Sequence, residues 1–183
     1  NLQRTGAMGT YASLEGQEAI GTGIGFAMHK DDVLVPYYRD TATQVQRGVL
    51  LEEILRYWGG DEWGMHFQHQ QQDLPVSVPI ATQACHATGI GFAFKYRKQA
   101  RAVVTTCGDG ATSKGDFYES INVAGAMKLP VVFVVNNNRW AISVPLEKQT
   151  AAETIAHKAL AAGITGYRVD GNDPVAVFHV LHS

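Results

Sequence analysis

Two short apolar runs, at residues 102–106 and 131–135, most constrain how this chain can fold. Both runs are uninterrupted rather than alternating, which is typical of strands that are buried on both faces. Between them lies a stretch with helical character at residues 117–128, which ends before Pro130. Two strands joined by a crossing helix form a βαβ unit, in which the strands run parallel. The sequence therefore predicts a parallel sheet that is covered by helices on both faces.

The rest of the chain continues this alternation of helices and short strands. We expect further helices at residues 13–29, 45–58, 80–97 and 150–163 and from Asp173 onward, and further strands at 33–35 and 167–169. Two of the helices begin with capping-box spacings, Asp116 with Glu119 and Thr150 with Glu153. Residues 61–78 are polar and are expected to form a long loop. The predicted fold class is α/β, with a doubly wound, mostly parallel sheet.

Length and charge limit the possible classes of function. The 183 residues suffice for one sizeable core, so we expect residues 1–183 to form a single domain. The formal net charge of -2 gives no electrostatic reason to expect nucleic acid or an anionic membrane as a partner. No apolar run approaches the roughly 18 residues that a membrane-spanning helix needs. The chain begins at Asn1 without a methionine and ends at Ser183 directly after an apolar stretch, so we expect the domain to be incomplete at both ends.

Cysteine usage indicates the cellular compartment. Only two cysteines occur, Cys85 and Cys107, and they form neither a metal-type pair nor a disulfide framework. A reducing environment is the default for such a chain, so a cytoplasmic location is expected. Both cysteines lie in apolar sequence surroundings, which favours inert packing.

Polar residues directly follow both apolar runs of the predicted βαβ unit. A Gly-Asp-Gly motif at residues 108–110 follows the first run, and three asparagines at residues 136–138 follow the second. Parallel strands end at the same edge of a sheet, where open α/β sheets bind their ligands. We therefore expect Asp109 and an asparagine to lie side by side at that edge.

The residue types at this edge suit one kind of ligand. Gly108 and Gly110 allow a tight turn and a close approach of the backbone. Asp109 supplies a carboxylate oxygen and an asparagine supplies a neutral amide oxygen, a donor set that suits Mg²⁺ when phosphates and water complete the octahedron. Taken alone, Gly-Asp-Gly is most often only a turn. Its position after a buried strand, with asparagines after the next strand, favours a Mg²⁺ ion that arrives with a diphosphate.

At residues 108–116 and 137–143, this pattern resembles the thiamine-diphosphate fingerprint, in which Asn-Asn follows Gly-Asp-Gly after some thirty residues. The chain resembles the α subunit of the heterotetrameric 2-oxo acid dehydrogenases, which are the decarboxylating components of pyruvate and branched-chain dehydrogenase complexes. The resemblance extends over nearly the whole chain and includes residues 37–40, 79–83, 128–130 and 169–171. It implies a thiamine-diphosphate-binding fold with thiamine diphosphate and Mg²⁺ as cofactors.

The resemblance also implies roles for individual residues. Asp109 and the side chain of Asn138 are expected to coordinate Mg²⁺, together with the backbone carbonyl of Trp140. Tyr38 and Arg39 are expected to reach the diphosphate, since a guanidinium fork matches phosphate oxygens.

Further cofactor contacts are implied around these residues. Gly110 and Ala111 place backbone amides near the phosphates, and Gly108 allows the backbone to approach. Ile80 or Ile142 is expected to support the bent conformation of the cofactor.

Partners and substrate also follow from the resemblance. The glutamate that activates the pyrimidine ring is expected on a β subunit, so we assign no catalytic residue to this chain. Pyruvate is the preferred 2-oxo acid, because Val78 stands where branched-chain relatives tend to have serine and residues 137–150 look most like bacterial pyruvate dehydrogenase α subunits. The acyl group is expected to pass to the lipoyl arm of an acyltransferase, within a hetero-oligomer.

Other interpretations remain open at this point. The substrate can be a branched-chain 2-oxo acid. The chain can be a non-catalytic cofactor-binding or scaffold subunit, or a phosphate-binding α/β protein unrelated to thiamine. For single residues, Arg39 can simply pair with Asp40 or Asp32, and Ile80 and Ile142 can be core residues.

Two further groups of residues have more than one possible role. Ser77, Pro79, Thr82 and Gln83 match a monovalent-cation site of branched-chain relatives. His66 and His69 lie in the expected loop and can bind substrate or metal, but loop histidines without a third ligand are usually solvated.

Overall fold

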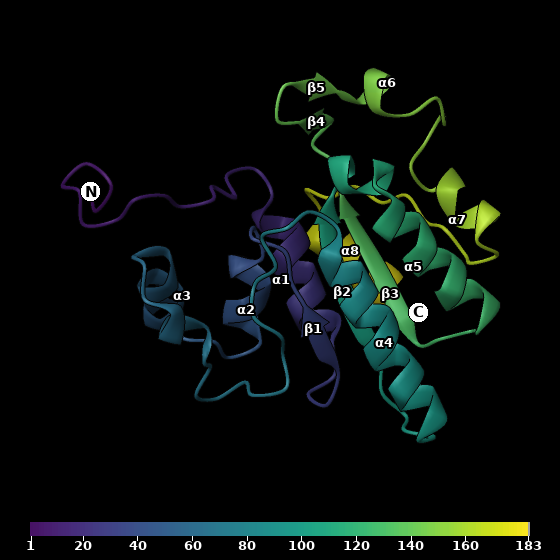
Figure 1. The fold of residues 1–183 in the computed structure, drawn as a ribbon, viewed down its shortest axis with the longest axis horizontal. Coiled ribbons are helices and arrows are strands. Elements are labelled where there is room, and N and C mark those ends of the chain that lie inside the picture. The colour runs from purple at the N-terminus through teal and green to yellow at the C-terminus, as the bar shows by residue number, and fades with distance from the viewer. Residues whose placement is uncertain (183) are drawn as a thin grey trace.

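The computed structural model describes residues 1–182 and has a parallel sheet at its centre (Figure 1). Strands β1 (Val33–Val35), β2 (Val103–Gly108) and β3 (Val131–Asn136) pair in the order β1-β2-β3. Val104 of β2 pairs with Leu34 of β1 on one side and Val132 of β3 on the other, and both pairings are parallel. The predicted βαβ unit is therefore confirmed, with helix α5 (Gly115–Ala126) as its crossing helix.

Helices and a small hairpin complete the described chain. The other helices are α1 (Glu18–Ala27), α2 (Thr41–Gln46), α3 (Leu51–Trp58), α4 (Thr82–Tyr96), α6 (Leu146–Gln149), α7 (His157–Ala161) and α8 (Pro174–His182). Two 3-10 turns are η1 (Glu62–Met65) and η2 (Asp109–Ser113), and strands β4 (Trp140–Ala141) and β5 (Val144–Pro145) form an antiparallel hairpin.

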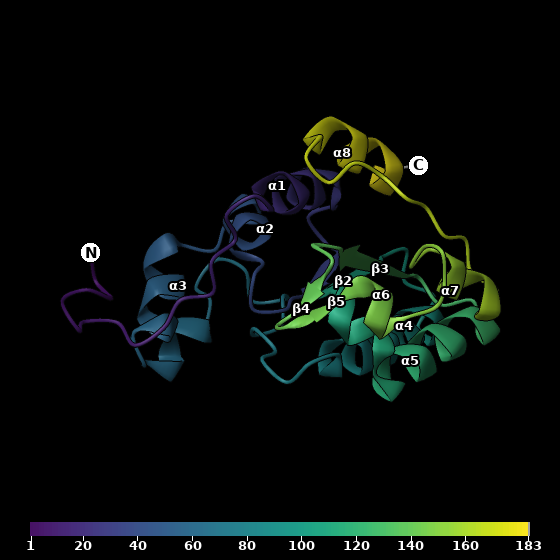
Figure 2. The same cartoon turned by 90° about the horizontal axis from the view of Figure 1, so that it is seen from above.

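Helices cover both faces of the sheet, and β1 and most of β2 are buried as expected. The expected full burial of the run at residues 131–135 is wrong, because β3 is an edge strand and these residues are half-buried. On one face, Phe94 of α4 packs in a core cluster with Val103. On the other face, Ile24 of α1 and Val177 of α8 pack in a second cluster with Val104. Figure 2 shows the sheet between α1 and α8 on one side and α4 and α5 on the other. The α/β class is thus as the sequence predicts.

The prediction of one continuous helix at residues 45–58 is wrong. The structure has two helices there, α2 and α3, separated by a turn. Gly48 in this turn has a φ of 95°, a left-handed conformation that glycine adopts without steric cost. The apolar periodicity continues across the turn because Val49 and Ile54 both enter one small core cluster with Phe67.

Both predicted capping boxes are also wrong. Helix α5 begins at Gly115, and the carboxylate of Asp116 pairs with the ammonium of Lys114 at 2.6 Å instead of capping the helix. The hydroxyl of Thr150 accepts the N–H of Ala152 in a local turn. Helix α7 then starts only at His157. Local side-chain contacts compete successfully with the capping pattern at both places.

Other helix and strand boundaries differ from the sequence pattern. Helix α1 begins at Glu18, after a turn at Glu15 and Gly16, rather than at Ser13. The predicted strand at residues 167–169 is absent from the described chain, where Tyr167 is exposed and no neighbouring strand pairs with it. The final helix is confirmed, since the Asp173 carboxylate accepts the N–H groups of Val175 and Ala176 at 2.9 and 3.1 Å. Within residues 1–182, no helix has the length and apolarity required to cross a bilayer.

Candidate functional site

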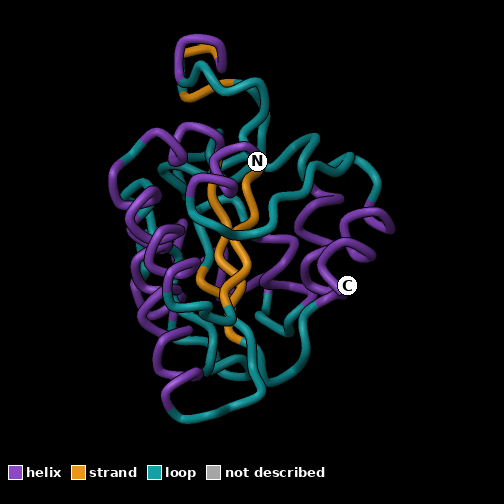
Figure 3. Tube along the Cα trace, turned by 90° about the vertical axis from the view of Figure 1, so that its right-hand side faces the viewer, coloured by secondary structure: helices purple, strands orange, loops and turns teal. Residues whose placement is uncertain are grey.

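The carboxyl ends of β2 and β3 lead into segments that touch each other, as the sequence predicts. Strand β2 ends at Gly108 and continues into η2, while β3 continues into the loop before β4. A Cβ placed on Gly110 would lie 2.6 Å from the Cβ of Ala141, so η2 and β4 are in direct contact. Figures 1 and 3 show the β4–β5 hairpin standing above this edge of the sheet. The Asp109 turn and the hairpin therefore share one location.

Asp109 is buried at this edge and fixed by a side chain that no motif in the sequence singles out. The Nε2 of Gln149, on α6, donates to Asp109 Oδ2 at 2.9 Å and to the carbonyl of Val144 at 2.9 Å. The hydroxyl of Ser113 donates to the carbonyl of Gln149 at 3.1 Å. Gln149 thus fastens the hairpin to the carboxylate. In the sequence, this glutamine is marked only by its place within residues 137–150, the stretch on which the family resemblance partly rests.

The three asparagines after β3 have different environments. Asn136 is buried, and its Nδ2 donates to the hydroxyl of Tyr37 at 2.6 Å. Asn137 and Asn138 are exposed, and Asn138 Oδ1 accepts the N–H of Trp140 at 3.0 Å. An amide oxygen has two lone pairs, so this bond leaves Asn138 able to accept a cation as well. Trp140 is itself exposed, with its backbone in β4 beside η2.

Tyr38 and Arg39 lie in the turn that follows β1. Both are half-buried, and the guanidinium carbon of Arg39 lies 4.9 Å from the centroid of the Tyr38 ring. Among the described residues, Arg39 forms no ion pair with Asp40 or Asp32. The simple ion-pair interpretation of Arg39 is therefore wrong, and its guanidinium stays available to another anion.

Asp40 ends the same turn and is fully buried. Its Oδ2 accepts the backbone N–H of Tyr37 at 3.1 Å and the hydroxyl of Thr106. Burial raises the pKa of Asp40 to about 7, and the hydrogen bonds from Thr106 and Tyr37 partly counter this rise. Burial, with a smaller contribution from the charge of Asp40, likewise raises the pKa of Tyr37. The sequence pattern contains no sign of this buried polar cluster.

A buried lysine adds positive charge to the Asp109 turn. The ammonium of Lys158, on α7, donates to the carbonyl and hydroxyl oxygens of Thr112 at 2.7 and 2.9 Å. It also lies 5.0 Å from the centroid of the Tyr118 ring. No carboxylate within the described chain forms an ion pair with Lys158. A buried ammonium without an anionic partner favours an anion at this site.

The remaining expected contacts have mixed surroundings. Ile142 is fully exposed with a φ of 57°, a conformation that β-branched residues rarely adopt, and Ile80 is 45% exposed, so neither is a core residue. Ala111, a residue of η2, is buried. A Cβ on Gly108 would meet no atom within 4 Å, so packing inside the chain does not require glycine there, whereas the contact with Ala141 does require it at residue 110.

The residues with more than one possible role form no metal cluster. His66 and His69 are exposed, and residues 1–182 contain no group of three or more histidine, cysteine or acidic side chains arranged for a metal ion. Gln83 is buried and donates to the carbonyl of Thr106 at 2.8 Å, while Ser77 is half-buried in the preceding loop. A monovalent cation at these residues stays a prediction.

The two cysteines differ from each other. Cys107 is buried, and burial raises the pKa of its thiol to about 12, in keeping with inert packing. Cys85 is exposed on α4, where the hydroxyl of Ser120 donates to its sulfur at 3.5 Å, so the prediction of an apolar setting is wrong for this residue.

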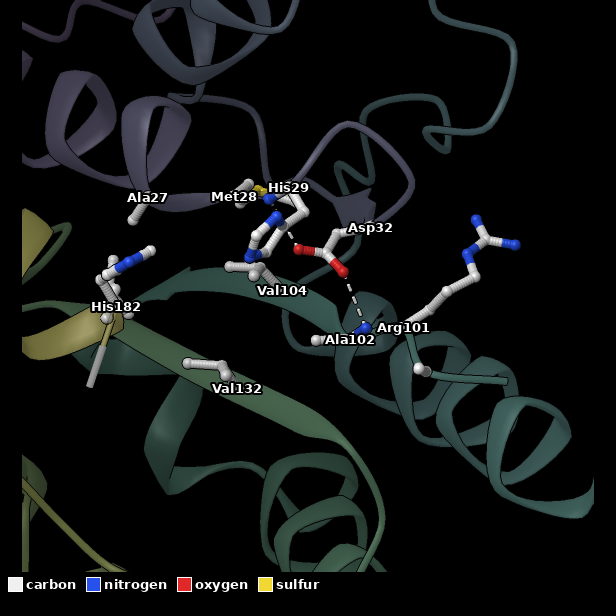
Figure 4. A pocket seen from close by; sticks show the side chains of 11 residues that line it. Ala27, Met28, His29, Asp32, Arg101, Ala102, Val104, Val132 and His182 are labelled. Carbon is white, nitrogen blue, oxygen red and sulfur yellow. Dashed lines mark hydrogen bonds between the residues drawn. The ribbon is translucent and has the colours of Figure 1, made fainter. Parts of the chain in front are cut away.

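A hollow of about 280 Å³ lies at the opposite edge of the sheet (Figure 4). It is lined by Val104 and Val132, near the amino ends of β2 and β3, and by His29 and His182. The carboxylate of Asp32 there accepts the backbone N–H of His29 and that of Ala102, both at 2.8 Å. This carboxylate accepts hydrogen bonds from the backbone and lies at the amino ends of the strands. The hollow is therefore separate from the Asp109 edge, which is the edge at the carboxyl ends of β2 and β3.

The comparison with known families agrees with the sequence pattern. Residues 1–182 match the family described as dehydrogenase E1 component. The chain belongs to the dehydrogenase E1 component family. This confirms the resemblance that the fingerprint at residues 108–116 and 137–143 suggested.

Similar members of this family come from several bacteria. The chain is 44% identical over 178 residues to the pyruvate dehydrogenase E1 component subunit alpha of Bacillus subtilis, covering 97% of the chain and 48% of that protein. It is 38% identical over 179 residues to the subunit of the same name from Mycoplasma genitalium, covering 98% of the chain and 50% of that protein. A Staphylococcus aureus subunit of this name is 43% identical over 178 residues, covering 97% of the chain and 48% of that subunit. The chain spans about half the length of these relatives.

Proposed function

We propose that this chain is the part of a pyruvate dehydrogenase E1 α subunit that binds the diphosphate and Mg²⁺ of thiamine diphosphate. The observation that carries the proposal is the meeting of the Asp109 turn with the β4–β5 hairpin at the carboxyl edge of a parallel sheet. The names of the similar bacterial proteins support the choice of reaction and of pyruvate. The corresponding fold is the doubly wound thiamine-diphosphate-binding fold.

The charges at the edge fit a diphosphate with one divalent cation. The ammonium of Lys158 is buried without a carboxylate partner, and the guanidinium of Arg39 forms no ion pair in the described chain. Two cationic groups match the excess negative charge of a diphosphate, and the open space beside Gly108 admits close approach. These residues fit the cofactor.

The oxygen donors fit Mg²⁺. Asp109 offers one carboxylate, Asn138 an amide oxygen and Trp140 a backbone carbonyl, which are hard ligands of the type that Mg²⁺ takes beside phosphate oxygens and water. A single carboxylate is too little charge for an all-protein cage, so the ion is expected to bind together with the diphosphate. Gln149 keeps the Asp109 carboxylate oriented through its hydrogen bond.

The residues of this chain bind and orient rather than exchange protons. When bound, thiamine diphosphate would supply the nucleophilic carbon and the electron sink that decarboxylation of a 2-oxo acid requires. Arg39 holds phosphate oxygens, and the exposed side chains of Ile80 and Ile142 offer apolar surface that excludes water and supports the bent cofactor. The glutamate that activates the pyrimidine ring belongs to the proposed β subunit.

The proposed enzyme is a cytoplasmic hetero-oligomer. Large apolar side chains lie exposed on α4, on α5 and directly after α5, which supports contact with another chain: they include Phe92, Tyr96, Val123 and Met127. We assign the β subunit as the partner that completes the site and a lipoyl-bearing acyltransferase as the acyl acceptor. The chain alone is then catalytically silent.

The test is an assay of 2-oxo acid decarboxylation with thiamine diphosphate and Mg²⁺. The full-length α subunit is assayed before and after the β subunit is added, with pyruvate and with 2-oxoisovalerate. We expect turnover only in the assembled enzyme and a preference for pyruvate. Full turnover by the α subunit alone would refute the shared site, and a preference for 2-oxoisovalerate would refute the substrate assignment.

A further inference from the structure

A buried polar cluster joins the three backbone segments that carry the proposed cofactor contacts. We define the Asp40 cluster as Asp40 and Tyr37 in the turn after β1, Thr106 in β2 and Asn136 at the end of β3. The carboxylate of Asp40 accepts the hydroxyl of Thr106 and the N–H of Tyr37, the latter at 3.1 Å. The Nδ2 of Asn136 donates to the hydroxyl of Tyr37 at 2.6 Å. One network therefore spans all three strands of the sheet.

Every member of the Asp40 cluster is buried, with exposed fractions between 0 and 4%. Hydrogen bonds in such surroundings are strong, and the loss of one partner leaves the other desolvated and unsatisfied. The N–H of Tyr37 also reaches the hydroxyl of Thr106 at 3.2 Å, so both ends of the turn are bonded to this one hydroxyl of β2. The cluster consequently makes the turn a rigid extension of the sheet.

Tyr38 and Arg39 lie between the two residues that the cluster fixes. Arg39 stacks on the ring of Tyr38, and no ion pair within residues 1–182 anchors its guanidinium. The ring of Tyr38 in turn lies 5.3 Å from that of Tyr37, centroid to centroid. The location of Arg39 at the sheet edge therefore depends on the backbone of the turn that Asp40 closes.

We propose that Asp40 is a positioning residue that presents Tyr38 and Arg39 to the diphosphate. The inference rests on the proposed function, because it takes the cofactor to bind at the Asp109 edge. Asp40 acts through the backbone N–H of Tyr37 and the hydroxyl of Thr106 and itself touches no cofactor atom. Its other oxygen, Oδ1, has no hydrogen-bond partner in the described chain, so a single oxygen performs the whole clamping role.

Because only Oδ2 of Asp40 accepts hydrogen bonds, a variant that keeps one oxygen acceptor at this position should keep the clamp. Asparagine at residue 40 has nearly the same shape, and its amide oxygen can accept both hydrogen bonds. Asp40→Asn should therefore preserve the turn, whereas Asp40→Ala removes the acceptor for Thr106 and Tyr37.

Asp73 provides a matched control, because it is also a buried carboxylate that holds backbone. It accepts the N–H of Leu34 at 2.8 Å and pairs with Arg47 at 2.6 Å. These contacts tie the loop at residues 61–78 to the middle of β1 and do not involve the turn after that strand. Asp73→Asn should lower thermal stability and leave cofactor affinity unchanged in the folded enzyme.

The experiment measures thiamine diphosphate affinity in the assembled full-length enzyme at saturating Mg²⁺, by titration well below the melting temperature. Asp40→Ala should weaken affinity by about tenfold, as expected when a hydrogen bond that orders a binding turn is lost. It should raise the cofactor concentration for half-maximal activity more than it lowers kcat at saturation. Asp40→Asn and Asp73→Asn should both bind thiamine diphosphate with an affinity close to that of the wild type.

The outcomes separate this inference from the proposed function. Failure of the wild-type enzyme to bind thiamine diphosphate with Mg²⁺ would refute the proposed function and the inference with it. Normal wild-type binding with unchanged affinity in Asp40→Ala would overturn the inference alone, as would equal losses in Asp40→Ala and Asp40→Asn. If Asp40→Ala does not fold, Thr106→Val decides, because it deletes the one hydroxyl that donates to Asp40 and accepts the N–H of Tyr37 and leaves the carboxylate in place. Weakened affinity supports the clamp, and wild-type affinity contradicts it.

Discussion

At the scale of residues, Gly108 and Gly110 flank Asp109 but face different surroundings. A Cβ on Gly110 would lie 2.6 Å from Ala141 Cβ, so Gly110→Ala should lower the free energy of unfolding by about 1–3 kcal/mol, as overpacking does. A Cβ on Gly108 meets no protein atom within 4 Å, so Gly108→Ala should leave stability nearly unchanged. If the cofactor approaches there, Gly108→Ala should weaken thiamine diphosphate binding.

Urea unfolding and cofactor titration of both variants check this pair. A stability loss in Gly108→Ala comparable with that in Gly110→Ala would contradict the packing argument. Unchanged cofactor affinity in Gly108→Ala would contradict the proposed approach of the backbone to the phosphates.

Arg39 allows a second test, since the structure excludes its simplest structural role. Arg39→Lys should weaken thiamine diphosphate affinity by about tenfold, because a point charge does not reproduce the bidentate fork of a guanidinium. Thermal stability should change little, because the guanidinium forms no ion pair within the described chain. Calorimetric titration and a melting curve of the same variant measure both quantities, and a stability loss with intact affinity would contradict the assignment.

Asp40 should make stability depend on pH. Burial raises its pKa from 3.8 in the unfolded chain to about 7 in the folded protein, so between these values the folded state holds a proton that the unfolded state has lost. The stability that this group contributes is fully present below about pH 3.8 and is lost as the pH rises through about 7. The melting temperature of the wild type relative to Asp40→Asn should therefore fall between pH 5 and pH 8, roughly the window around that pKa. A constant difference would show that the carboxyl does not hold its proton in the folded state.

Residue types and strand ends allowed the Asp109 turn and the asparagine loop to be placed together from the sequence. The same reasoning placed Asp109 at a strand end, but it did not predict that the residue is 1% exposed and bonded to Gln149. No sequence pattern predicted a role for Lys158 or Thr106 at this site. Burial of a polar side chain depends on which distant elements cover it, and no local pattern in the sequence carries that information.

At the scale of elements, one buried ion pair joins α2's end, β1 and the loop at residues 61–78. Arg47 donates to both oxygens of Asp73, at 2.6 and 2.8 Å, and to the carbonyl of Asp32 at 2.7 Å. The side chains of the pair are only 3% and 1% exposed. Arg47→Ala would leave the Asp73 carboxylate buried and unpaired, so the free energy of unfolding should fall by about 3–5 kcal/mol.

The exposed pair of Arg56 and Asp61 provides the control for this prediction. Their side chains are 48% and 40% exposed, so water replaces the interaction when it is lost. Urea unfolding should show little change for Arg56→Ala. Equal losses in Arg47→Ala and Arg56→Ala would contradict the importance of burial.

Elements with strong periodicity were predictable, and their boundaries were not. The apolar runs of β2 and β3 identified both strands and their parallel pairing, because continuous apolar sequence requires cover on both faces. The break between α2 and α3 at Gly48 was missed, since the apolar periodicity continues across the turn. The strand expected at residues 167–169 did not form, and β3 is an edge strand of the described sheet, with β2 as its one neighbour.

At the scale of the whole molecule, one edge of the sheet is the proposed diphosphate site. Segments from all three strands converge there, and helices α6 and α7 contribute Gln149 and Lys158 from distant sequence. The hollow at the opposite edge holds carboxylate and backbone groups that satisfy one another.

The measurement that tests this proposed site most directly is a calorimetric titration of thiamine diphosphate into the assembled full-length enzyme, with and without Mg²⁺. Asp109→Asn is the variant of choice, because it keeps the shape and the hydrogen bond to Gln149 and removes the charge. We predict tight binding that requires Mg²⁺ in the wild type and loss of the Mg²⁺-dependent affinity in Asp109→Asn, with a nearly unchanged melting temperature. Equal Mg²⁺-dependent affinity in the two proteins would show that the metal and diphosphate do not bind at this edge.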